Sequence, residues 1–258
     1  NCNKTQSPVN EDLKGVRDSI LAVNSEFKKE TESLLRSVEN GHTQNLQKGF
    51  DHLRLTYKRM EWAVEYFLPH SARFINGPAI PEIEMEEHTI LEPQGLQMLE
   101  TYFYPEYNAE NKAEVIRHLK IILSKSGTID ANFKSITMNR SQVFDALRDE
   151  VFRISSLGIA GFDTPVSGKN LSEIPVVLQS ITSVITRISG GGSSKEKEQI
   201  ISLANAAGLY LNKNQDREQF DYSFFIPNYL NKISKLFRIH FRASDSLPAL
   251  IWRVILDR

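Results

Sequence analysis

Apolar residues recur at alternating spacings of three and four along most of this 258-residue chain. One such stripe runs from Leu13 to Leu34, and another runs from Phe50 to Phe67. This spacing gathers apolar side chains on one face of an α-helix, and that face is stable when it packs against other helices. The sequence shows no convincing pair of strands. It therefore predicts an all-α protein.

The order of the stripes predicts two packed helical bundles. We expect residues 1–9 to form a flexible tether, residues 10–157 an N-terminal bundle and residues 158–258 a C-terminal bundle. The boundary is placed in a stretch rich in glycine and proline that begins at residue 158. Residues 69–93 begin with a proline and contain several more, so we expect a long, irregular connection there.

Charge and cysteine content exclude several classes of protein. The net charge is −1, without the basic excess that is typical of nucleic-acid-binding proteins. No apolar run is long enough to cross a bilayer. Cys2 is the single cysteine, so no internal disulfide forms. The sequence has no Cys-x-x-Cys-His motif, which excludes covalent c-type haem from this chain.

Cys2 fits the lipid-modified cysteine of a bacterial lipoprotein. It precedes a polar run, as such a cysteine does once its signal peptide has been removed. The protein would then contact a membrane only through lipid on Cys2. The alternative is an ordinary cysteine in a flexible tail.

The stretch from Leu91 to Tyr104 contains the strongest candidate for a polar site. It predicts a short helix that is apolar on most sides, and such a helix is usually buried. Gln97 and Glu100 lie three residues apart on it, and buried polar side chains need partners. Gly95 has no Cβ, so another backbone can approach closely just before them.

These residues also resemble a known family. The run Gly95-Leu-Gln97-Met-Leu-Glu100 resembles the Gly-x-His-x-x-Glu motif of imelysin-like proteins, with Gln97 in place of the histidine. Arg73–Ile80 resembles the segment before that motif. Leu157–Pro165 is similar to part of the imelysin-related domain that precedes di-haem cytochrome c peroxidase modules. The matches fall between Arg73 and Pro165.

The resemblance implies two similar helical bundles with a polar site between them, at which the family motif is proposed to bind iron. It also implies a periplasmic or outer-membrane-anchored lipoprotein, with a haem peroxidase module or an iron-uptake protein as partner. Glu100 is the one metal ligand retained here, because the amide of Gln97 is a weak ligand for iron. Three readings stay open: a buried hydrogen-bonded pair, a small-ligand site and an iron site.

Other charged residues interrupt or flank the stripes. Glu30 lies on the stripe of the first helix, and Arg140 lies on the stripe of a helix expected over 130–154. We expect them to pair with each other, to meet Glu100 or to be solvated, because an unpaired buried charge is costly. Glu61 and Glu65 are four residues apart and could hold a cation as paired carboxylates, but we expect them on the charged flank of an exposed helix.

The residues favour a non-catalytic module over an enzyme. The sequence lacks the His-Glu-x-x-His and His-x-x-x-His patterns of zinc peptidases, and no order of Ser, His and Asp suggests a nucleophile. The favoured function is a non-catalytic, extracytoplasmic imelysin-like module linked to iron or haem metabolism. The alternatives are a metal-dependent hydrolase and a purely structural interaction domain.

Overall fold

The computed structural model describes residues 8–84, 89–189 and 193–240. Within these ranges the fold is all-α apart from one short strand pair, which confirms the expected fold class. No described helix is long and apolar enough to cross a membrane. The helices are α1 Pro8–Glu39, α2 Leu46–Lys58, α3 Glu61–Phe67, α4 Pro69–Asn76, α5 Leu96–Phe103, α6 Lys112–Ser135, α7 Arg140–Arg153, α8 Asn170–Arg187, α9 Ser194–Lys213, α10 Tyr222–Phe225 and α11 Asn231–His240. The shorter elements are η1 Ala109–Asn111, η2 Ile154–Gly158, η3 Ile226–Leu230, β1 Glu82–Glu84 and β2 Thr89–Leu91.

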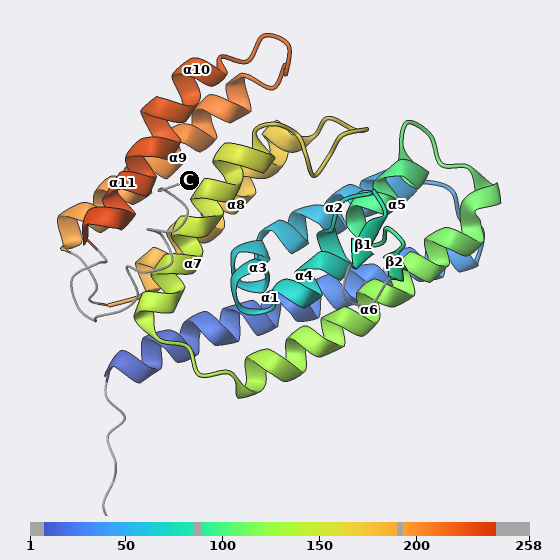
Figure 1. The fold of residues 1–258 in the computed structure, drawn as a ribbon, viewed down its shortest axis with the longest axis horizontal. Coiled ribbons are helices and arrows are strands. Elements are labelled where there is room, and N and C mark those ends of the chain that lie inside the picture. The colour runs from blue at the N-terminus through green and yellow to red at the C-terminus, as the bar shows by residue number, and fades with distance from the viewer. Residues whose placement is uncertain (1–7, 85–88, 190–192, 241–258) are drawn as a thin grey trace, which may run out of the picture.

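The helices form two neighbouring groups (Figure 1). In the first group, α1 lies along α6 and packs on α2, and α3, α4 and α5 lie beside them. In the second group, α8 packs along α9, and α11 packs on both α9 and α7. Contacts of α7 with α3 and of α8 with α2 join the two groups. The bundle boundary expected at residue 158 stays a prediction, and Cys2 with most of the expected tether lies outside the described residues.

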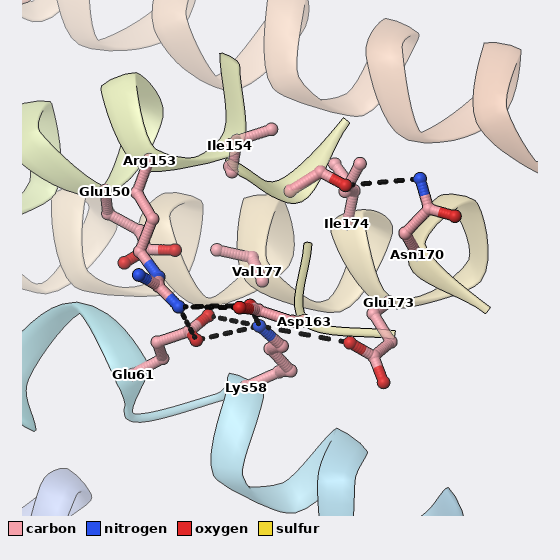
Figure 2. Close-up of a pocket in the computed structure, with 11 residues that line it drawn as sticks. Lys58, Glu61, Glu150, Arg153, Ile154, Asp163, Asn170, Glu173, Ile174 and Val177 are labelled. Carbon is pink, nitrogen blue, oxygen red and sulfur yellow. Dashed lines mark hydrogen bonds and ion pairs between the residues drawn. The ribbon is translucent and has the colours of Figure 1, made fainter. Parts of the chain in front are cut away.

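The stripe from Phe50 to Phe67 is divided between two helices, because the backbone turns at Met60. The N–H of Met60 donates to the carbonyl of Tyr57 at 2.9 Å, and Met60 has φ −120° and ψ 0°. Lys58 therefore ends α2 and Glu61 begins α3. The turn directs both side chains toward the junction between the groups (Figure 2).

The connection over 69–93 is more regular than expected. Pro69 does not interrupt the chain there but lies in the first turn of α4, where its missing N–H costs no hydrogen bond. Strands β1 and β2 then pair antiparallel, with Ile83 opposite Ile90. Strands of three residues are too short to show a clear alternation, so the sequence does not predict this pair.

The single helix expected over 130–154 is also two helices. Helix α6 ends at Ser135, and α7 begins after a capping box in which Asn139 and Gln142 bond each other's backbone N–H groups. Arg140 is therefore the first residue of α7 and does not lie on the inward stripe of a longer helix.

Candidate functional site

Gly95 permits the close backbone approach that the sequence predicts. Its φ is +89°, and a Cβ built on it would lie 2.4 Å from the carbonyl oxygen of Ile75 and 2.6 Å from that of Phe74. Any other residue would therefore collide with the end of α4 and adopt a strained backbone. This contact fixes where α5 begins against α4.

Gln97 on α5 is buried and hydrogen-bonded. Its amide NH₂ donates to the backbone carbonyl of Asn76 at 2.8 Å and to the Asp163 carboxylate at 3.1 Å. The side chain is 2% exposed, which confirms the expected burial. Gln97 thus links α5 to the end of α4 and to the loop over 159–169.

Glu100 lies one turn further along α5 and is fully buried. It accepts hydrogen bonds from the Ser167 N–H at 2.8 Å, from the Ser167 hydroxyl at 2.5 Å and from the Val166 N–H at 3.4 Å. Gln97 and Glu100 therefore hold two points of the same loop. Both are partnered, as the reading of a buried hydrogen-bonded pair requires.

Lys58 lies at the centre of a buried ion network (Figure 2). Its ammonium is 2.7 Å and 2.9 Å from the two oxygens of Glu61, 2.5 Å from Asp163 Oδ2 and 3.9 Å from Glu173 Oε2. Burial alone would lower the pKa of Lys58, but the adjacent carboxylates of Asp163 and Glu61 raise it above its ordinary value. Lys58 therefore stays charged.

Two arginines complete the network. Arg54 forms a two-point ion pair with Glu173, at 2.6 Å and 3.0 Å. Arg153 lies 3.0 Å and 3.1 Å from the two oxygens of Asp163 and 3.3 Å from Glu61. Burial raises the pKa of Asp163, but Lys58 and Arg153 outweigh that effect and lower it.

The charges of the network can balance. Three cations, Arg54, Lys58 and Arg153, face three carboxylates, Glu61, Asp163 and Glu173. Two further carboxylates border the network. Burial raises the pKa of Glu150 well above its usual value and that of Glu65 to about 7, so both favour the neutral form more than an exposed glutamate does.

The space beside the network is small. A cavity of about 20 Å³ is bordered by Lys58, Glu61 and Asp163 on its polar side and by Ile174 and Val177 on its apolar side. That volume holds roughly one water molecule, whereas ligand pockets usually measure roughly 300 Å³ or more. In this conformation the network leaves no room for an organic ligand.

Glu30 and Arg140 do not form a pair. Glu30 on α1 lies 3.0 Å from His52 Nε2, and Arg140 lies 3.3 Å from Asp12 on α1. Neither contacts Glu100, which is held by the loop. The pairing hypothesis is wrong because Arg140 begins a separate helix instead of facing inward from a longer one.

The expectation for Glu61 is also wrong. Glu61 is fully buried, and Glu65 lies partly buried beside Arg153 at 3.8 Å. An exposed flank would follow from one continuous helix, but the turn at Met60 redirects Glu61 inward. Asp163 and the three network cations were not identified from the sequence. One available signal was Asp163 itself, which lies in the Leu157–Pro165 segment that carries the family resemblance.

The fold and the site define an all-α protein with a closed, charge-balanced polar network. Compared with known proteins, the chain matches no protein-family model and no curated protein. Kinship with imelysin-like proteins therefore stays the prediction that the short motifs make.

Proposed function

We propose that this chain is a non-catalytic, extracytoplasmic helical module of the imelysin-like type, linked to iron or haem metabolism or accessory to a haem peroxidase, in which the polar site fastens helices together instead of binding a metal. The observation that carries the proposal is the position of Lys58. Its ammonium lies among three carboxylates, where a metal cation would otherwise balance their charge.

The retained motif residues support the same proposal. The loop over 159–169 bonds to both residues. Its Asp163 accepts a hydrogen bond from the Gln97 amide, and its Ser167 N–H donates one to the Glu100 carboxylate. A metal at this site would have to break those bonds and expel Lys58. The neutral amide oxygen of Gln97 is a weaker ligand for iron than the imidazole of the family motif.

The test is calorimetric titration with ferrous iron under anaerobic conditions, using the unmutated protein, Gln97→Ala and Glu100→Gln. We expect the three isotherms to agree, because neither side chain binds iron. Iron binding that Gln97→Ala or Glu100→Gln removes would overturn the proposal. Circular dichroism confirms that each variant keeps its helical content.

Of the two alternatives, the structural interaction domain is favoured by a specific observation. The cavity beside the network holds about one water molecule, and Glu100 is sealed beneath Ser167. A metal-dependent hydrolase needs an open coordination position for its water and substrate. The Lys58 network offers none in this conformation.

A further inference from the structure

A second cluster of ligand-type side chains lies outside the ion network, where α2 packs on α1. Glu26 and Glu30 are one turn apart on α1, and His52 faces them from α2. One ligand atom from each residue lies within 4.8 Å of the others. His52 Nε2 and Glu30 Oε1 are 3.0 Å apart.

An independent observation comes from the second oxygen of Glu30. This atom is buried and has no hydrogen-bond partner among the described residues, although the Glu30 side chain as a whole is 18% exposed. An unpaired buried carboxylate oxygen is costly, and a bound metal cation is one partner that would satisfy it.

We propose that Glu26, Glu30 and His52 bind a late first-row divalent cation, for which Zn²⁺ is the probe. Imidazole nitrogen and carboxylate oxygen are both ligand types that zinc accepts, and a site with three protein ligands leaves its fourth position to water. Zinc bond lengths separate neighbouring donor atoms by roughly 3.3 Å, close to the distance between His52 and Glu30. His52 is 68% exposed, so the cluster is accessible from solvent.

Arg59 is the competing group. It lies 2.7 Å from Glu26 Oε2, and both side chains are about 40% exposed, at 42% and 43%. Glu26 has a second oxygen for the cation, so Arg59 can keep its bond and orient the carboxylate, as outer partners of metal ligands commonly do. The cation would join α1 to α2 and is distinct from the network around Lys58.

The test is calorimetric titration of the full chain, freed of metal by a chelator, with zinc chloride. All proteins carry Cys2→Ser, which removes a competing thiolate ligand. We expect one zinc ion per chain, and at least tenfold weaker binding in His52→Ala and in Glu30→Gln. His42→Ala is the matched control, because His42 is an exposed histidine outside the cluster.

Two further readouts make the assignment specific. Magnesium should bind far more weakly than zinc, because it prefers oxygen ligands alone. Cobalt(II) should give the visible spectrum of a site with nitrogen and oxygen ligands, and His52→Ala should abolish it. No zinc binding, or zinc binding that His52→Ala and Glu30→Gln leave unchanged, would overturn the proposal. The ferrous-iron titration uses variants of Gln97 and Glu100 alone, and the zinc titration uses variants of His52 and Glu30. Either proposal can therefore be refuted without affecting the other.

Discussion

Replacing Lys58 by methionine tests whether the buried network stabilises the fold. Methionine keeps an unbranched side chain that ends one atom short of the lysine nitrogen, so it removes the ammonium from Glu61, Asp163 and Glu173. Removing one partner of a buried ion pair costs about 3–5 kcal/mol, because it leaves the other charge unpaired. Arg153 still reaches both Asp163 and Glu61, so we expect a loss near the lower end, about 3 kcal/mol.

The assay is urea unfolding followed by circular dichroism at neutral pH, with Lys48→Met as the control. Lys48 lies on the same helix and is exposed, so its replacement should change the free energy of unfolding by less than about 0.5 kcal/mol. The loss in Lys58→Met should shrink in acid. Folding lowers the pKa of Asp163, so its ionised carboxylate stabilises the folded state fully at pH values above its unfolded-state pKa. This stabilisation is lost as the pH falls below that pKa toward the lower folded-state value. A loss no larger than that of Lys48→Met would refute the reasoning.

Three other predictions concern separate parts of the molecule. Gly95→Ala should lower the free energy of unfolding by more than about 2 kcal/mol, because its Cβ meets two carbonyls and its φ is positive; denaturant unfolding measures this, and an unchanged midpoint would contradict it. Glu65 has a pKa raised from the ordinary value of 4.5 to about 7. Its ionisation therefore lowers the free energy of unfolding as the pH rises from 4.5 toward 7. Glu65→Gln should therefore be more stable than the unmutated protein at pH 8 but not at pH 5, and equal differences at both pH values would count against this. Cys2→Ser in the full precursor should release the protein from the membrane fraction if Cys2 carries lipid; unchanged fractionation would argue for an ordinary cysteine.

The sequence predicts the helical fold well because its helices bury one stripe each. The stripe residues Val16, Ile20 and Phe27 are all buried in α1, as their spacing indicates. The same reasoning predicts that Gln97 and Glu100 are buried and partnered, since a helix that is apolar on most sides leaves its polar residues no route to solvent. These predictions depend only on local spacing.

The network is not predictable in that way, because its members come together only through tertiary packing. Lys58 and Glu61 look like neighbours on one exposed helix, but a turn made without proline or glycine divides that helix, and both side chains become buried. Asp163 lies in a loop, where no periodicity shows which side chains point inward. Charged residues are almost never fully buried without partners, and the partners of Asp163 are 105 residues and 10 residues away along the chain.

The loop over 159–169 explains why the polar site is closed. It inserts Asp163 between Lys58 and Arg153, and its far end holds Glu100 through Ser167. The loop is therefore attached to α2, α5 and α7 by charged groups that have little contact with water. Breaking any one attachment exposes a charge that the others cannot fully neutralise. A ligand at the Gln97 position would have to displace Asp163, and with it the partner of both cations. For this reason we infer that the arrangement favours a permanent structural contact over reversible binding of a metal.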